Sequence, residues 1–171
     1  EFISELVKDA ISKLSNKSLS DEEKAKFIEE VALEYVDIDA LGLYTLGELR
    51  KSSDERTIEK YQSAFEKYFL KSLTSRLTDY SSSTFEIVEI EQKSSKYTIV
   101  KSKVIPQDGK PEIKIDWRIY TKNKDRPLIR DLIVEGLSLA RTQKEEFASI
   151  LISNNNEIEV LIQKLKDFVK N

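Results

Sequence analysis

Apolar and polar residues recur along the chain with two different periods. From residue 2 to about residue 80 the apolar positions return every three or four residues, which predicts helices. From about 84 to 136 the period shortens to two, and from about 138 to 170 it is helical again. Within the middle part, alternating runs predict four strands, at 84–92, 97–106, 112–121 and 127–135.

The connections between these strands determine the predicted topology. The segments 93–96, 107–111 and 122–126 are too short for parallel crossovers, so the sheet should be an antiparallel meander. We predict an α+β fold in which a curved four-stranded sheet is covered on its concave side by helices from both ends of the chain. This plan resembles the cone-shaped nuclear-transport-factor-2-like architecture. No repeat or linker divides the chain, so residues 1–171 should form a single domain.

Capping residues mark the expected ends of several helices. Ser20 with Glu23, and Ser52 with Glu55, match the capping box, and the second pair should open the longest helix. Ser138 can cap the helix after the last strand. The short helix before Gly47 is apolar on more than one side, which indicates either burial or contact with an apolar partner that is not protein.

The first apolar stripe, over 2–14, could pack on the core or anchor the chain to a membrane surface. Its polar face mixes Glu, Asp and Lys, which favours core packing.

Composition excludes most catalytic classes. The chain has 171 residues, a net charge of −3, and neither Cys nor His. Thiol nucleophiles, imidazole bases, disulfides and the usual zinc sites are therefore absent, and no basic face for nucleic acid is expected. No apolar run approaches the ~20 residues of a membrane span. We predict no catalytic and no metal-binding residues.

An enzyme or small-molecule-binding protein on the same fold remains an alternative. It would need an ionisable group in the pocket, and the strand carboxylates nearest to it are Asp116, Asp131 and Glu135. Strand carboxylates are more often solvated or paired with a neighbouring cation such as Arg118 or Arg130.

Several segments in order resemble one known family. Residues 131–139 read Asp-Leu-Ile-Val-Glu-Gly-Leu-Ser-Leu and are followed by Phe-Ala-Ser at 147–149. Two further segments lie upstream. One reads Val-Asp-Ile-Asp-Ala-Leu at 36–41 and leads to a Leu-Gly pair at 46–47, and the other is a predicted strand that reads Ile-Asp-Trp-Arg-Ile at 115–119. Together they resemble the MlaC family of periplasmic phospholipid carriers, also called toluene-tolerance proteins. The likeness extends over nearly the whole chain.

The chain departs from the family pattern at four places. Pro127 and Arg130 stand where aromatic residues are common, Thr-Gln-Lys at 142–144 replaces Asn-Tyr-Arg, and Leu49 replaces an aromatic beside Arg50. These changes bear on lipid choice and partner contacts more than on the fold.

The resemblance implies a soluble carrier of the Mla lipid-transport system, which maintains outer-membrane lipid asymmetry in Gram-negative bacteria. Such a carrier would ferry phospholipid between an inner-membrane ABC-transporter complex, through its mammalian-cell-entry-domain subunit, and an outer-membrane lipoprotein–porin complex. The chain has no signal segment, and we expect a periplasmic protein from which it has been removed. We expect a monomer with bound phospholipid as ligand and no cofactor.

A carrier of this kind needs an apolar cavity for the acyl chains. Each candidate wall residue could equally be ordinary core, and a purely structural adaptor would have all of them packed together. The candidates are Leu43, Leu46, Tyr61, Phe65, Phe69, Leu73, Ile115, Trp117, Ile119, Leu132, Val134, Leu139, Phe147 and Leu151.

For partner docking we predict a cluster of cations on the outward faces of adjacent strands. The alternative is a solvated strand face without a partner. The candidate residues are Lys101, Lys103, Lys114 and Arg118.

Overall fold

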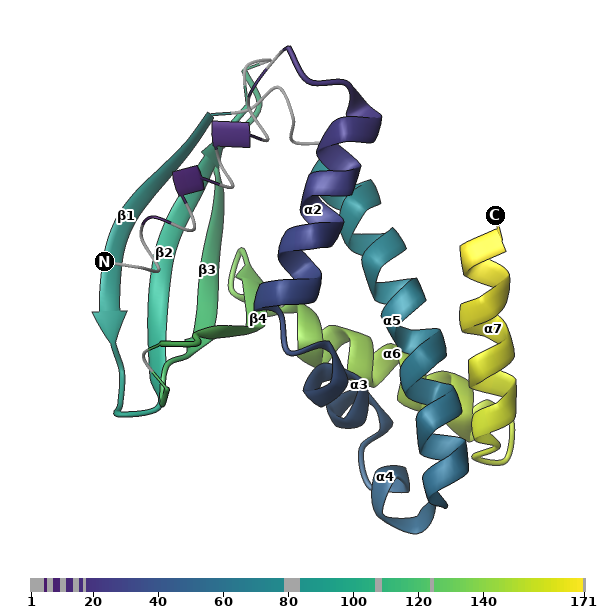
Figure 1. The fold of residues 1–171 in the computed structure, drawn as a ribbon. Helices are drawn as coiled ribbons and strands as arrows, with labels where there is room; N and C mark the ends of the chain where they lie inside the picture. Colours follow the sequence, from purple (N-terminus) through teal and green to yellow (C-terminus); the bar gives the residue numbers. More distant parts are fainter. Residues whose placement is uncertain are drawn as a thin grey trace.

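The computed structural model describes residues 18–78, 84–106, 109–123 and 125–170, apart from the side chains of 77 and 78, together with residues 5, 8, 9, 12, 13 and 16. This part of the chain contains six helices and a curved antiparallel sheet of five strands. Figure 1 shows the sheet on one side and the helices on the other, an α+β arrangement of two layers. The helix predicted over 2–14 rests on apolar residues outside the described part.

In the described residues, four helices precede the sheet. The hydroxyl of Ser20 accepts a hydrogen bond from the Glu23 N–H at 3.1 Å, so the first predicted cap is confirmed. The second is wrong: Ser52 ends a short helix, and the Asp54 carboxylate caps the long helix by accepting from the Thr57 N–H at 2.7 Å. The four helices are α2 (Asp21–Tyr35), α3 (Ile38–Leu46), α4 (Leu49–Ser52) and α5 (Glu55–Thr78).

The sheet is a meander of five strands, not four. The added strand, β5, forms a hairpin with β4. The two residues of its turn, Glu135 and Gly136, have φ values of 50° and 81°. Positive φ at both positions matches the twist of an antiparallel pair, and glycine adopts it without a steric penalty. The nuclear-transport-factor-2-like cone stays a prediction. The strands are β1 (Thr84–Gln92), β2 (Tyr97–Ile105), β3 (Ile113–Tyr120), β4 (Leu128–Val134) and β5 (Leu137–Ser138).

Alternation along the strands gives the sheet two distinct faces. On β2, Val100 and Val104 are fully buried, while Lys101 and Lys103 on the opposite face are partly exposed. Val100 pairs with Trp117 across the β2–β3 ladder, which puts the indole on the same inner face. The apolar positions of β2 and β3 therefore share the face that is turned toward the helices.

Two helices follow the sheet, α6 (Leu139–Ser153) and α7 (Ile158–Lys170). The Ser138 hydroxyl accepts a hydrogen bond from the Arg141 N–H at 3.1 Å, as predicted for the cap of α6. Asn155 and Asn156 have φ values of 57° and 58°, a conformation that Asn tolerates better than most residues, and they turn the chain back into α7. No helix in the described residues is apolar and long enough to cross a membrane.

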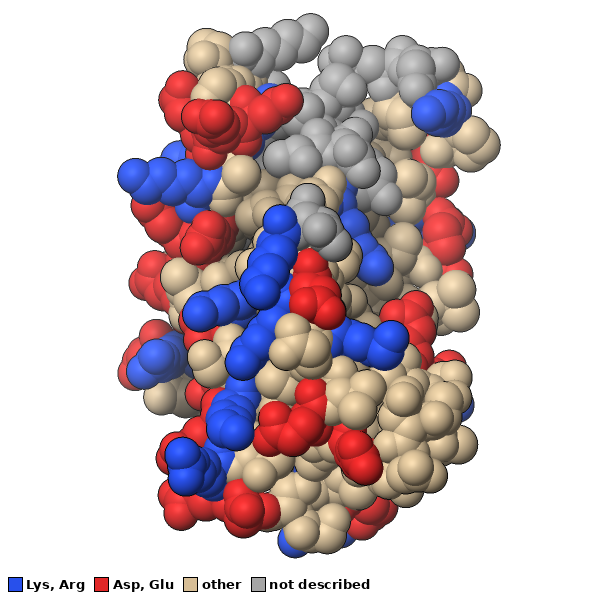
Figure 2. Space-filling model, turned by 90° about the vertical axis from the view of Figure 1, so that its right-hand side faces the viewer, with Lys and Arg blue, Asp and Glu red and all other residues tan. Residues whose placement is uncertain are grey.

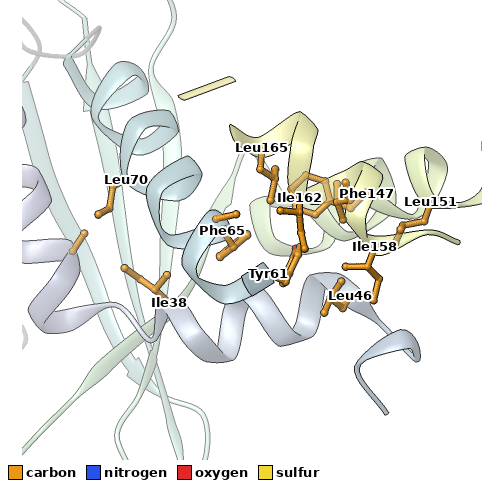
Figure 3. Close-up of a cluster of buried hydrophobic side chains, with 13 residues drawn as sticks. Ile38, Leu46, Tyr61, Phe65, Leu70, Phe147, Leu151, Ile158, Ile162 and Leu165 are labelled. Carbon is orange, nitrogen blue, oxygen red and sulfur yellow. The ribbon is translucent and has the colours of Figure 1, made fainter. Parts of the chain in front are cut away.

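The main hydrophobic core lies within the helical layer. Side chains from α3, α5, α6 and α7 converge there (Figure 3), and Tyr61 and Leu161 in it are fully buried. A smaller core on the inner face of the sheet contains Val100, Ile119 and Ile129. The two cores are separate clusters, and this separation leaves space between the layers.

Candidate functional site

A cavity occupies the space between the two cores. It lies among α2, α3, α5 and α6 on the helical side and β3 and β4 of the sheet. Its free volume is about 150 Å³, and it is partly open to solvent. An apolar cavity of about 150 Å³ can hold a benzene-sized group.

The walls of this cavity are mostly apolar and come from every layer that surrounds it. Helix α2 contributes one side, the aromatic stripe of α5 another, and the inner face of the sheet a third. The apolar residues are Phe27, Ile28, Val31, Ala32, Val36, Leu41, Phe65, Phe69, Leu73, Trp117, Ile129, Leu132, Leu139 and Ala140.

Two of the aromatic walls are held in place by neighbours. The Trp117 indole N–H donates to the Ser102 hydroxyl at 2.9 Å, and that hydroxyl donates to the Ile115 carbonyl at 2.8 Å. Phe65 stacks on Phe69 with 5.9 Å between ring centroids. Because rings have few rotatable bonds and these have fixed neighbours, the walls keep their shape without a ligand.

Polar side chains form a rim along the α5–α6 side. The Tyr68 hydroxyl donates to Gln143 Oε1 at 2.9 Å, and Gln143 Nε2 donates to Glu146 Oε2 at 3.1 Å. Burial raises the pKa of Tyr68 and the charge of Glu146 raises it further, while the Gln143 hydrogen bond, the charge of Arg76 and a Ser72 hydrogen bond lower it. Gln143, Glu146, Arg76 and Ser72 therefore surround the Tyr68 phenol at the edge of the cavity.

The remaining polar groups of the cavity already have partners. The Asp131 carboxylate accepts hydrogen bonds from the Ser138 hydroxyl and from the N–H groups of Leu132 (2.8 Å) and Ala140 (3.0 Å). It thereby ties β4 to the first turn of α6. Thr45 donates to the Gly42 carbonyl at 2.6 Å and is hydrogen-bonded to Tyr61.

The other two candidate bases lie elsewhere. Glu135 is exposed in the β4–β5 turn, where it accepts from the Lys114 N–H at 2.7 Å. Asp116 faces outward opposite Lys101. Within the described ranges, no group of three or more His, Cys, Asp or Glu side chains could hold a metal ion.

The predicted wall residues divide into two groups. Six of the fourteen line the cavity: Phe65, Phe69, Leu73, Trp117, Leu132 and Leu139. The other eight lie outside it, most of them buried in the helical core or on the sheet: Leu43, Leu46, Tyr61, Ile115, Ile119, Val134, Phe147 and Leu151.

The largest omission from the predicted site is the apolar face of α2. Its three- and four-residue spacing is visible in the sequence, but a stripe of this kind is typical of core packing as well. Five residues from α2 and its C-terminus line the cavity: Phe27, Ile28, Val31, Ala32 and Val36.

The predicted docking cations lie on the outward sheet face, and two of them are ion-paired there. Lys101 lies 3.7 Å from Glu89 and 3.5 Å from Glu91, and Lys103 lies 3.5 Å from Glu86. Arg118 stacks on the Tyr97 ring, with 4.1 Å from the guanidinium carbon to the ring centroid. This face therefore carries mixed charge.

Cations also gather on the helical side of the molecule. Figure 2 shows a band of basic side chains running down that face, with acidic side chains beside it. On α5, Lys60 pairs with Glu159 at 3.4 Å, and the Lys71 amine donates to the carbonyls of Phe168 (3.0 Å) and Val169 (2.9 Å). These two cations join α5 to α7.

Comparisons with known proteins agree on the family and the fold. The family model described as MlaC protein matches residues 4–167, which confirms the resemblance seen in the sequence. The structure of a phospholipid-binding protein from Ralstonia solanacearum, in complex with a phospholipid, is similar to this one with a TM-score of 0.77. The two sequences are 15% identical over 98% of this chain and 94% of that chain. No curated protein matches the chain.

Proposed function

Because the chain belongs to the MlaC family, we propose that it is a phospholipid-binding carrier that encloses acyl chains between its helices and its sheet. The observation that carries this proposal is the cavity itself. Its walls are mostly apolar on the α2, α5 and sheet sides, and a polar rim lies along the α5–α6 edge. Asp131 and Thr45, which also line it, are hydrogen-bonded to their own chain. The phospholipid in the similar Ralstonia solanacearum structure supports the same ligand class.

The energetics of the ligand call for such an enclosure. Two acyl chains carry roughly 30 methylenes, and at ~0.8 kcal/mol each their exposure to water costs on the order of 20 kcal/mol. The phosphate is well hydrated and gains nothing from burial. A soluble carrier must therefore cover the tails and can leave the headgroup at the rim.

The size of the cavity bears on how the tails fit. If each methylene occupies about the volume of a water molecule, ~30 Å³, two tails need roughly 900 Å³. The cavity of about 150 Å³ is too small for this. We infer that α2, which forms one wall, shifts to make room for the tails.

The wall side chains proposed to contact lipid are the six predicted residues that line the cavity, together with the α2 face. Tyr61 and Phe147, two of the eight predicted residues that lie elsewhere, pack behind the wall residue Phe65. Phe147 meets Phe65 edge-on at 6.4 Å between ring centroids.

We propose that the carrier works in the periplasm and shuttles phospholipid between the inner- and outer-membrane complexes of the Mla system, as the family resemblance implies. Lys101, Lys103, Lys114 and Arg118 remain the proposed docking residues. Charge reversal at Lys114 and Arg118 should weaken binding to a membrane complex, and unchanged binding would contradict the docking role.

We also propose that the protein is not an enzyme. Two of the three candidate bases lie outside the cavity. The third, Asp131, accepts three hydrogen bonds from its own chain, which leaves it poorly placed to accept a substrate proton.

Lipid uptake by the delipidated protein from phospholipid vesicles tests the carrier function. Val31 lines the cavity from α2, and Val31→Trp should fill the space and lower the bound lipid at least several-fold. Leu33→Trp is the matched control, because Leu33 lies on the same helix, is 50% exposed and does not line the cavity. Equal uptake by the folded Val31→Trp variant, or no uptake by the wild type, would overturn the proposal.

A further inference from the structure

The cavity rim carries two opposite charges that have no ion-pair partner in the described part of the chain. Arg76 comes from the end of α5 and Glu146 from α6, and both line the cavity. No described carboxylate lies within 4.0 Å of Arg76, and no described cation lies within 4.0 Å of Glu146. Glu145, which precedes Glu146 on α6, does have an ion-pair partner, Arg141 at 3.3 Å.

The negative charge is held in a definite place. Glu146 Oε2 accepts from Gln143 Nε2, and Gln143 is itself held by the hydroxyl of Tyr68. A carboxylate has about four acceptor positions, and this hydrogen bond uses one of them. Glu146 can therefore accept further hydrogen bonds from a donor at the mouth of the cavity.

The positive charge lies along the neighbouring helix. Tyr68, Ser72 and Arg76 are spaced four residues apart on α5, so they share one face of that helix and lead from the phenol to the guanidinium. The guanidinium has five N–H donors and suits a phosphate oxygen pair. The rim thus offers an anion site and a cation site on two facing helices.

We propose that this rim binds the headgroup of a zwitterionic phospholipid, with the phosphate diester at Arg76 and the ammonium group at Glu146. The inference rests on the proposed carrier function and adds a headgroup preference to it. A phosphoethanolamine headgroup satisfies both charges. A phosphoglycerol headgroup satisfies Arg76 but brings only hydroxyl groups to Glu146, so the carboxylate gains no opposite charge.

The size of the preference follows from the exposure of the rim. Charge pairs at exposed sites contribute modestly, which corresponds to a preference of about three-fold for phosphatidylethanolamine over phosphatidylglycerol. Salt screens exposed charges, so the preference should decrease at 0.5 M NaCl, where the Debye length is only a few ångströms.

The test is a competition. Delipidated protein is incubated with mixed micelles that contain equal amounts of phosphatidylethanolamine and phosphatidylglycerol with identical acyl chains, and native mass spectrometry gives the ratio of the two adducts. Glu146→Gln should lower the ratio from about three towards one without changing total loading. Glu146→Lys should invert it. Glu145→Gln, the matched control on the same helix, should leave it unchanged.

The role of Arg76 is tested by comparing the loading of phospholipids with the loading of a lipid that has no phosphate. Arg76→Gln should weaken loading of both phospholipids relative to a diacylglycerol with the same tails, which has no phosphate, whereas Lys67→Gln on α5 should not. A wild-type ratio of one, or a ratio that Glu146→Gln leaves unchanged while lipid still loads, would overturn this inference and leave the carrier function standing. Failure of every lipid to load would overturn both.

Discussion

The Asp37 carboxylate binds the Arg130 guanidinium, with its Oδ2 atom 3.1 Å from Nη2 and 3.3 Å from Nε. Asp37 also caps α3 by accepting from the Ala40 N–H at 3.3 Å, so the pair joins the helical layer to β4. Arg130 stands where the family commonly has an aromatic residue. It donates to the Tyr97 hydroxyl at 3.2 Å and lies over the Tyr120 ring, which accounts for a cation at this position.

A double-mutant cycle should detect this connection. Asp37→Asn keeps a capping oxygen but loses the charge, and Arg130→Gln removes the guanidinium. Because the Arg130 and Asp37 side chains are only 30% and 22% exposed, we expect a coupling energy of about 1 kcal/mol in urea unfolding, at the upper end for surface pairs. A coupling that is indistinguishable from zero would mean that the layers are joined by packing alone.

Substitution of Asp131 separates a structural role from a catalytic one. Asp131→Asn keeps an oxygen for the N–H groups of Leu132 and Ala140 but changes the partner of the Ser138 hydroxyl. The free energy of unfolding should fall by about 1 kcal/mol, and lipid uptake at matched folded protein should stay the same. Loss of uptake in the folded variant would instead assign Asp131 to the binding site.

Cavity wall and core should respond differently to truncation. Phe147 is 3% exposed in the helical core, and Phe147→Ala should cost about 3–5 kcal/mol of unfolding free energy. Phe69 faces space that is already open, so Phe69→Ala should cost about 1–2 kcal/mol. Only the second variant should change lipid uptake while remaining well folded at 25 °C. Equal costs would mean that the cavity closes in solution.

Tyr61 should make the fold sensitive to alkali. Burial raises the pKa of its phenol, and the hydrogen bond with Thr45 lowers it by less. Above the unfolded value of about 10, the unfolded chain releases a proton that the folded protein keeps, so stability falls with rising pH by up to about 1.4 kcal/mol per unit. Below pH 10 this contribution is fully present.

The Tyr61→Phe variant tests this assignment. It should lose about 1 kcal/mol at neutral pH, because one buried hydrogen bond is removed. Its urea midpoint should then fall less steeply than that of the wild type between pH 10 and 11. Parallel curves for the two proteins would show that Tyr61 does not cause the alkaline loss.

The strands could be predicted well from the sequence. The alternation of apolar and polar residues and the residues that favour turns both depend on a few neighbouring positions only. The predicted strand over 84–92 coincides with β1, and β2, β3 and β4 end within a residue or two of the predicted limits. The strand β5 escaped prediction because it is two residues long and Ser138 in it also caps α6. The cap of α5 was also mispredicted for a local reason. Ser52 is the last residue of α4, so Asp54 caps α5 in its place.

Wall and core could not be separated from sequence, because the difference is tertiary. Tyr61 and Phe65 lie one turn apart on the same stripe of α5, yet only Phe65 reaches the cavity. The α2 face has the spacing of a core stripe and lines the cavity. The ion pair between Lys101 and Glu89 is easier to predict from sequence than the cavity walls are. The two residues are opposite each other in the β1–β2 register.

Native mass spectrometry of the protein purified from a bacterial host, followed by solvent extraction and lipid analysis, tests the central claim most directly. We predict a one-to-one phospholipid adduct on the wild type and on Leu33→Trp, and little or none on Val31→Trp. A wild-type protein without lipid that also takes up none from vesicles would contradict the carrier function.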